Sequence, residues 1–199
     1  MNRNAKCIIP VLALVLILTG CATWQYMDKG MPWKCSYFEA SLPVGWVKFN
    51  TPFTHLLFLT KDGILLQRIT LSKRDTGKEL KFSKKKISGD MLIHDIAGII
   101  VDELSLNQDF KNLQILENKP ADITGIDGFK IIYEFNNADF VKYKSITYGF
   151  IIQKQYYELE YTAAKQYYFD RDLADFSAFF SNFKINKESA AKPVTPPKL

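Results

Sequence analysis

The segment that most constrains how this chain folds is an apolar run close to its N-terminus. Arg3 and Lys6 precede the run, which extends from Cys7 to Leu18 and is interrupted only by Pro10. Such a run is too short to cross a hydrocarbon core of about 30 Å as a helix, because that distance requires roughly 20 residues. Its length is typical of the apolar core of a secretory signal. We therefore expect residues 1–20 to be removed and the remainder to fold outside the cytoplasm.

A second motif follows directly. Leu18-Thr19-Gly20-Cys21 resembles the lipobox of bacterial lipoproteins. The resemblance implies that the thiol of Cys21 becomes a diacylglyceryl thioether and that Cys21 is the first residue of the mature chain. The alternative is a buried or redox cysteine that ends a transmembrane segment, but the basic residues, the run length and all four motif positions favour lipidation. Ala22 stands where an aspartate tends to retain Gram-negative lipoproteins in the inner membrane, so we expect the outer membrane, facing the periplasm.

The chain after the signal is long enough for one domain with a substantial core. Phe and Tyr, with 15 and 10 residues, dominate the aromatic content and favour a fold rich in β-sheet. Removing the signal takes two of the 26 basic residues and leaves a net charge of +3, which gives no sign of a nucleic-acid-binding surface. Besides Cys21 only Cys35 then remains, so an inert, half-buried thiol is favoured over pairing between chains.

Three segments follow the signal. Residues 21–35 are expected to form a short lipidated tether, whose side chains would either lie at the membrane interface or cover one end of the domain. Residues 36–186 are expected to form the domain. Residues 187–199 are rich in Pro, Ala and Lys and are expected to be disordered. The large apolar side chains of the tether are Trp24, Tyr26, Met27, Met31 and Trp33.

Alternating apolar residues predict a sheet within the domain. Two strands are expected around Pro43, and two more around Asp62-Gly63, which is a hairpin signal. Lys73 to Lys86 reads as basic and weakly structured. The expected strands cover 37–40, 44–49, 55–60, 64–71, 113–117, 121–124, 129–135, 144–152 and 157–163.

The last two strands allow a more detailed prediction. Placing Tyr148 opposite Tyr161 and Phe150 opposite Leu159 gives one strongly apolar face around a four-residue loop. Lys144 and the preceding Lys142 then fall on the same face. This placement predicts either a later start of the strand or a bulge.

Two helices are expected. The first is predicted to begin with Ser88 or Asp90 as N-cap and to end near Leu106. The second is predicted to begin near Asp170. Each has a one-sided apolar stripe, formed by Ile93, Ile96, Ala97, Ile100 and Leu104 in the first helix and by Leu173, Phe176, Phe180 and Phe183 in the second.

Three stretches in this order resemble the PsbP-like family. They are Phe38-Glu-Ala-Ser-Leu-Pro-Val-Gly-Trp46, then Gly125-Ile-Asp-Gly-Phe-Lys-Ile-Ile-Tyr-Glu-Phe135, and finally Tyr157 to Ala163 with the closing Phe183-Lys-Ile185. The resemblance covers residues 36–186. It implies a single α+β domain in which helices pack on the faces of a mainly antiparallel sheet, an α/β/α sandwich. Members of this family mostly bind protein partners and share no catalytic residues, and a fold alone does not transfer a function.

Candidate chemistry is sparse. His55 and His94 lie in different elements without metal-ligand spacing, and His94 is expected to be structural. Glu158 and Glu160 share one face of a strand at about 6.6 Å, a separation found in inverting glycosidases. Any Glu-x-Glu strand gives this separation, and both side chains should point away from the aromatic face towards solvent or a lysine. No nucleotide-binding or nucleophile motif occurs, so we predict no catalytic, cofactor-binding or metal-binding residue and no cofactor.

One cluster of charge stands out, formed by Lys81, Lys84, Lys85 and Lys86. It would either rest on anionic lipid headgroups or form a solvated loop, and the solvated loop is favoured. The sequence thus predicts a non-enzymatic, membrane-anchored module that binds an unknown periplasmic protein. The alternatives are an envelope enzyme, which would cluster buried carboxylates in a cleft, and a carrier of a small apolar ligand, which would need a cavity between sheet and helices.

The anchor leads to a direct prediction. Cys21→Ser removes the sulfur that would carry the diacylglyceryl group, and with it the stable attachment that several acyl chains provide. We expect this variant to leave the membrane and the detergent phase in Triton partitioning, where the parent is retained. Continued partitioning of the Cys21→Ser protein into the detergent phase would contradict the anchor.

Overall fold

The computed structural model describes residues 24–35, 37–50 and 55–186. Cys21, the expected signal and the expected tail lie outside the described residues. Within the described part, α2 (Ile93–Ser105) and α3 (Tyr168–Asn182) lack the length and hydropathy that a membrane-spanning helix needs.

Most strands belong to one antiparallel sheet. Its order is β1-β4-β5-β6-β10-β9-β8-β7, so β1 and β7 are the edges. A smaller sheet has the order β11-β3-β2. The bounds in the large sheet are β1 (Trp24–Tyr26), β4 (Val47–Phe49), β5 (His55–Thr60), β6 (Gln67–Asp75), β7 (Lys111–Asp122), β8 (Asp127–Asn136), β9 (Lys142–Ile152) and β10 (Gln155–Ala164), and those in the small sheet are β2 (Met31–Cys35), β3 (Phe38–Leu42) and β11 (Lys184–Ile185).

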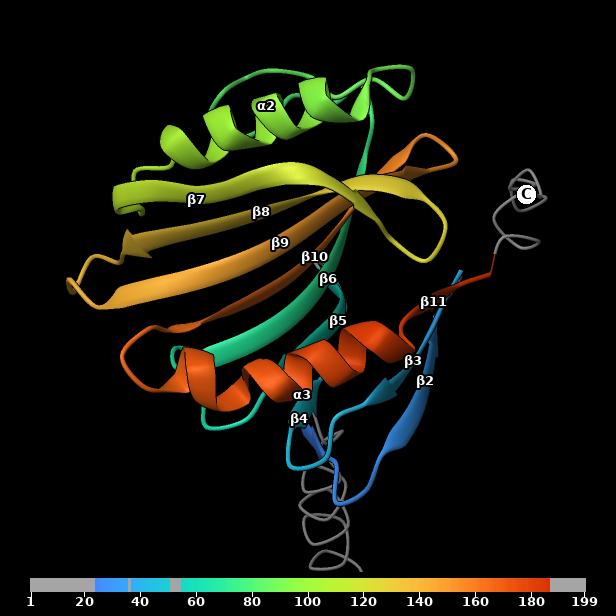
Figure 1. Cartoon of the computed structure of the whole chain (residues 1–199), viewed down its shortest axis with the longest axis vertical. Helices are drawn as coiled ribbons and strands as arrows, with labels where there is room; N and C mark the ends of the chain where they lie inside the picture. The colour runs from blue at the N-terminus through green and yellow to red at the C-terminus, as the bar shows by residue number, and fades with distance from the viewer. Residues whose placement is uncertain (1–23, 36, 51–54, 187–199) are drawn as a thin grey trace, which may run out of the picture.

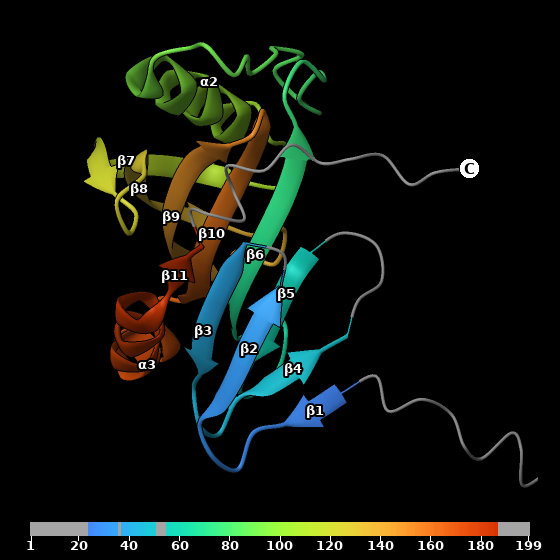
Figure 2. The ribbon, with the colours of Figure 1, turned by 90° about the vertical axis from the view of Figure 1, so that its right-hand side faces the viewer.

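The two helices lie on opposite faces of the large sheet. α2 packs on β7 and β8, whereas α3 packs on β6 and β10 beside the small sheet (Figure 1). Figure 2 shows the small sheet lying over β5 and β6, and its inward side chains share one core with those strands. The structure confirms the predicted α+β domain with helices packed on a mainly antiparallel sheet.

Alternate residues of β10 divide the core in two. Tyr157, Leu159 and Tyr161 pack on the α3 side, while Tyr156 packs on the α2 side. All four side chains are buried. Because successive side chains of a strand point to opposite faces, this pattern obliges both faces of the sheet to be covered.

The register of the β9–β10 hairpin differs from the prediction by two residues. Phe150 lies opposite Tyr157 and Tyr148 lies opposite Leu159. The connection is a two-residue turn, in which Gln153 and its neighbour Lys154 have φ angles of 48° and 59°. Positive φ at both positions is the geometry of a type I′ turn, which matches the twist of the strands. A shift of two residues keeps every side chain on its predicted face, so the apolar face was correct and the loop was too long.

Two further strand predictions were wrong. The stretches 113–117 and 121–124 form one strand, β7, which includes Pro120. An edge strand tolerates proline because its outer N–H groups need no partner in the sheet. β9 begins at Lys142 with no bulge against β10, and Lys144 places its ammonium 4.7 Å from the ring centre of Phe169, so the lysine covers the rim of the aromatic core.

Both helices begin away from the predicted caps. α2 begins at Ile93 after Leu92, while Ser88 hydrogen bonds to the carboxylate of Asp90 before the helix. α3 begins at Tyr168, so Asp170 lies within the first turn, where a negative charge favours the helix dipole. The buried side of α3 is formed by Phe169, Asp172, Phe176 and Phe179, and it continues into Phe183 after the helix; Leu173 and Phe180 are half-buried.

The expected tether is largely folded. Trp24–Tyr26 form β1 against β4, and Met31–Cys35 form β2 against β3. Met27 and Trp33 are buried, which matches the alternative in which these side chains cover one end of the domain. Trp24 and Tyr26 are exposed instead.

A charged cluster attaches α3 to the β5–β6 loop. The carboxylate of Asp172 is fully buried and receives hydrogen bonds from Lys61 Nζ at 3.0 Å, Gln67 Nε2 at 3.0 Å and Arg171 Nε at 3.0 Å. Burial raises the pKa of Asp172, but the hydrogen bonds from Arg171 and Lys61 lower it by more, so the group is ionised. Lys61 also pairs with Asp175, which accepts a hydrogen bond from the indole of Trp46.

Close packing between β8 and β9 leaves no room for a side chain at Gly149. A Cβ at Gly149 of β9 would lie 2.1 Å from the ring of Phe129 on β8. We expect Gly149→Ala to lower the free energy of unfolding by about 1–3 kcal/mol, since the ring must move within a packed core. Gly98→Ala in α2 is the matched control, because no atom lies within 4 Å of its Cβ position; it should stabilise by about 0.5–1 kcal/mol. Denaturant unfolding tests both, and equal stabilities would contradict the packing.

Candidate functional site

Among the described residues, Cys35 and the two histidines do not form a site. Cys35 is half-buried at the end of β2 and packs against the core, which fits an inert thiol. His94 is exposed beside Asp95, whereas His55 is half-buried with its ring centre 5.7 Å from that of Phe58. Burial lowers the pKa of His55. Among the described residues, no group of three His, Cys, Asp or Glu side chains is placed to hold a metal ion.

The two predicted glutamates meet a third carboxylate beneath α2. Glu158 and Glu160 of β10 and Glu103 of α2 line a pocket of about 180 Å³, which we name the polar pocket. The glutamates point away from the aromatic face, as predicted, but they face α2 and arginines. The remaining lining residues are Arg74, Phe82, Ile100, Leu104, Asn107, Phe110, Tyr133 and Thr147.

Glu160 and Glu158 have different surroundings within this pocket. Glu160 accepts a hydrogen bond from the hydroxyl of Thr162 and lies 3.7 Å from the guanidinium of Arg68. Glu158 accepts a hydrogen bond from the hydroxyl of Tyr156 at 3.0 Å. Burial raises the pKa of Glu158 and the charge of Glu160 raises it further, while Arg74 opposes both. Glu158 therefore keeps its proton to a higher pH than an ordinary glutamate.

Glu103 has a structural role. Its carboxylate accepts hydrogen bonds from the backbone N–H groups of Ser83, at 2.7 Å, and Phe82, at 3.0 Å. Burial raises the pKa of Glu103, but these two bonds lower it by more. The ionised carboxylate therefore attaches the segment before α2 to the helix.

The wall of the polar pocket contains one unsatisfied polar atom. The hydroxyl oxygen of Thr147 is buried and has no hydrogen-bond partner in the protein. Thr147 lies opposite Glu160 in the β9–β10 ladder. A buried hydroxyl usually finds a partner in protein or in ordered water. The pocket is thus polar enough to hold water or a small polar molecule.

The lysine cluster belongs to the segment that packs on α2. Lys85 pairs with Asp102 of α2, and Lys86 lies 3.7 Å from Glu79. Leu80 and Ile87 of the same segment are buried against α2. These contacts give the cluster a structural role as the edge of the α2 layer.

Exposed apolar side chains gather at the end of the sheet where three loops meet. These loops connect β5 to β6, β8 to β9, and β10 to α3. Leu65 and Phe140 are 71% and 75% exposed. We name this area the loop surface; its residues are Ile64, Leu65, Phe140, Val141 and Tyr167.

Hydrogen bonds join the three loops to one another. The N–H of Ala164 donates to the carbonyl of Leu66 at 2.9 Å, and the N–H of Lys165 donates to that of Lys142 at 2.8 Å. The hydroxyl of Tyr143 donates to the carbonyl of Leu65. Ile64 and Leu65 belong to the loop surface because β6 begins at Gln67 and not at residue 64 as the sequence had predicted.

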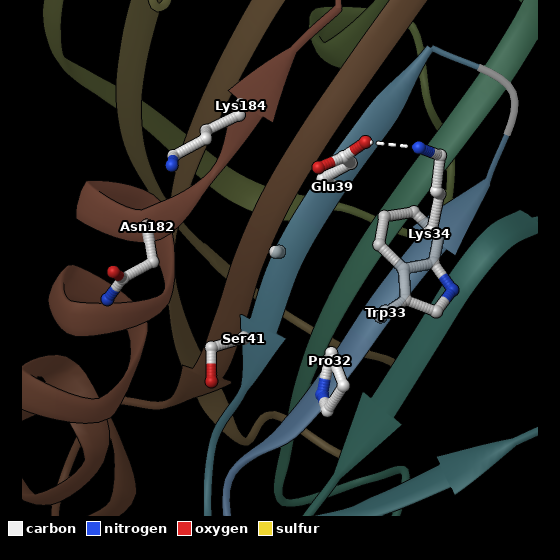
Figure 3. Close-up of a pocket in the computed structure, with 8 residues that line it drawn as sticks. Pro32, Trp33, Lys34, Glu39, Ser41, Asn182 and Lys184 are labelled. Carbon is white, nitrogen blue, oxygen red and sulfur yellow. Dashed lines mark hydrogen bonds and ion pairs between the residues drawn. The ribbon is translucent and has the colours of Figure 1, made fainter.

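Two other concave areas offer less. A groove of about 380 Å³ beside α3 has apolar walls, but its aromatic rings pack on each other, with 4.2 Å between the ring centres of Tyr148 and Phe180. An open groove of about 420 Å³ lies on the outer side of the small sheet, and Figure 3 shows the side chains that line it. There Lys34 and Glu39 point towards each other as a solvent-exposed ion pair, an interaction that contributes little free energy.

Comparison with known proteins identifies the fold. No protein-family model and no curated protein matches the chain. Its structure is similar to cyanobacterial PsbP (CyanoP) from Synechocystis sp. PCC 6803, with a TM-score of 0.54 and 12% identity, covering 83% of this chain and 94% of that chain. It is also similar to LpqN of Mycobacterium tuberculosis, with a TM-score of 0.54 and 11% identity, covering 86% and 95%. The domain has the PsbP-like fold.

Sequence reasoning found Glu158 and Glu160 but missed the rest of the polar pocket. Arg74, Glu103 and Thr147 come from three other elements, so no spacing along the chain connects them. The available signal was strand parity, since Thr147 lies opposite Glu160 once β9 and β10 are paired. For the loop surface, the sequence correctly left Phe140, Val141 and Tyr167 between strands but placed Ile64 and Leu65 inside one, and no pattern indicated that the three loops meet.

The proton on Glu158 predicts a pH dependence of stability. The folded protein keeps this proton where the unfolded chain has released it, so the free energy of unfolding falls as pH rises from the ordinary value of 4.5 through the raised pKa. Glutamine carries no such proton. We expect Glu158→Gln to match the parent at about pH 4 and to become relatively more stable as pH rises, measured by denaturant unfolding.

Glu134→Gln is the control with the opposite sign. Burial raises the pKa of Glu134, but Lys165 at 2.6 Å and Lys142 at 3.0 Å lower it by more. The stability that this carboxylate contributes is present above its unfolded pKa and is lost as the pH falls. Glu134→Gln should therefore be less stable than the parent at neutral pH and converge with it in acid. A Glu158→Gln protein with the parent's pH dependence would refute the raised pKa of Glu158.

Proposed function

We propose that this chain is a lipid-anchored protein of the bacterial cell envelope, held by Cys21 at the periplasmic side of the outer membrane. Its domain binds another envelope protein through the loop surface and catalyses no reaction. The observation that carries this proposal is the loop surface itself. The signal, the lipobox and Ala22 support the anchor and its location.

The composition of the loop surface suits a protein interface. Two aromatic and three aliphatic side chains form its centre, and aromatic residues are enriched where protein interfaces bury area. Charged pairs lie around it, because Lys142 and Lys165 both bind Glu134 and Arg171 binds Asp62. An apolar centre with a polar rim is the arrangement that marks contact sites on soluble domains.

The comparisons support an envelope role only through analogy. LpqN, which has the same fold, is described as involved in cell envelope biogenesis. That relation concerns fold, since the two chains share 11% identity. It agrees with the signal proposed for residues 1–20, which would direct the domain to the cell envelope.

A charge introduced at the apolar centre of the loop surface tests whether the surface binds a partner. Phe140→Asp buries a carboxylate at the interface, and loss of an interfacial anchor residue costs about 2 kcal/mol or more, equivalent to roughly 30-fold in affinity. We expect the partner that co-purifies with the parent from solubilised envelopes to be lost with this variant. The readout is the recovery of that one protein, identified by mass spectrometry and confirmed by photo-crosslinking from position 140.

Leu92→Asp is the matched control. Leu92 is 62% exposed, lies before α2 far from the loop surface in sequence, and occupies the N-cap position, where aspartate is favoured. The Leu92→Asp variant should recover as much of the co-purifying protein as the parent does. Equal recovery with Phe140→Asp, or crosslinks from position 92 and none from position 140, would show that the docking surface lies elsewhere.

A second candidate function is acid–base chemistry in the polar pocket. It is favoured by one observation, the juxtaposition of Glu158, whose pKa is raised by burial, with the carboxyl group of Glu160 in a pocket beneath α2. Complementation of a deletion strain separates the two functions. A docking role predicts that Glu158→Gln complements and Phe140→Asp does not, whereas an enzyme predicts the reverse.

A further inference from the structure

Trp24 is the exposed tryptophan among the three in the chain. Trp33 and Trp46 are buried, whereas Trp24 is 46% exposed and Tyr26, on the same face of β1, is 63% exposed. The ring of Trp24 packs at 4.3 Å on that of Phe49 of β4, so its orientation is held while much of its surface stays open. Two amphipathic aromatic side chains therefore project from one edge of the large sheet.

The position of this edge along the chain limits where it can lie. Trp24 follows Cys21 by three residues, which span at most about 11 Å when fully extended. Tryptophan and tyrosine are the side chains enriched at the headgroup level of membranes. With the acyl chains of Cys21 in the bilayer, the edge formed by β1 lies within reach of the headgroups by chain length alone.

We propose that the β1 edge is seated in the membrane interface, with Trp24 and Tyr26 among the lipid headgroups. The inference rests on the proposed anchor at Cys21. It adds an orientation to that anchor: the β1 edge of the large sheet lies at the bilayer, and the other strands lie farther from it. Both views place α2 and the basic segment before it at the opposite end of the molecule from β1 (Figures 1 and 2).

The strand order determines how far each strand of the large sheet lies from the β1 edge. Counted from β1, β9 and β8 are the sixth and seventh of the eight strands, and neighbouring strands are spaced by about 4.8 Å, so the β8–β9 loop lies roughly 25–30 Å from β1. Phe140 in that loop is therefore held away from the headgroups. The distant part of the loop surface stays available to a protein partner while β1 rests on lipid.

Tryptophan fluorescence in lipid vesicles tests the seating directly. The lipidated protein, purified from membranes, is reconstituted into phosphatidylcholine–phosphatidylglycerol vesicles with and without brominated acyl chains, which quench tryptophan at short range. We expect bromolipid to reduce the emission of the parent and the remaining emission to shift to shorter wavelength. Trp24→Phe, which retains the two buried tryptophans, should lose the quenching entirely.

A second reporter tests the orientation. Phe140→Trp in the Trp24→Phe background places the exposed indole at the distant loop, and we expect no quenching by bromolipid. Quenching of this reporter, with or without quenching of Trp24, would show that the domain lies with its loop surface on the bilayer and would overturn the proposed orientation.

Mass spectrometry of the mature N-terminus separates failure of this inference from failure of the anchor. A chain that carries no diacylglyceryl group at Cys21 refutes the anchor, and the inference falls with it. A lipidated chain that binds vesicles while Trp24 remains unquenched refutes the seating alone and leaves the anchor intact.

Discussion

The burial of both faces of one antiparallel sheet is the constraint on which the structure depends. β10 places Tyr157, Leu159 and Tyr161 on one face and Tyr156 on the other, so neither face can be left to water. α3 and the small sheet cover the first face and α2 covers the second. Because α2 packs on β7 and β8, the second face is less covered at β10 and β6, and polar residues such as Glu158, Glu160 and Arg68 occupy that part. The polar pocket is thus a consequence of how α2 is placed.

The charged cluster around Asp172 connects this core to the loop surface. A buried carboxylate is costly unless cations and hydrogen-bond donors surround it. Lys61 and Arg171 supply the cations, and both also bind or border the β5–β6 loop that carries Leu65. These contacts attach the start of the loop to α3. Binding by a preorganised loop loses less conformational entropy than binding by a mobile one.

The sequence was informative where a local pattern decides the structure. Alternation located β5, β8, β9 and β10, and the apolar stripes located both helices within a few residues. It failed where partners distant in the chain decide. The β9–β10 register slipped by two because such a shift preserves the apolar face, and Gln153-Lys154 carries none of the glycine or asparagine that usually marks its turn. β1 and β2 were missed because they are short, and their partners β4 and β3 must be known first.

The folding of the expected tether changes what a lipid anchor does for this domain. A free segment over residues 21–35 would reach about 50 Å at 3.3–3.6 Å per residue and would let the domain turn in any direction. With Trp24 already in β1, that reach shortens to three residues, and a lipid on Cys21 becomes a constraint on orientation. A protein partner that bound the loop surface would then meet it at a limited range of heights and angles above the membrane. Such restriction raises the effective concentration for a partner fixed in the same membrane, since fewer orientations must be sampled before contact.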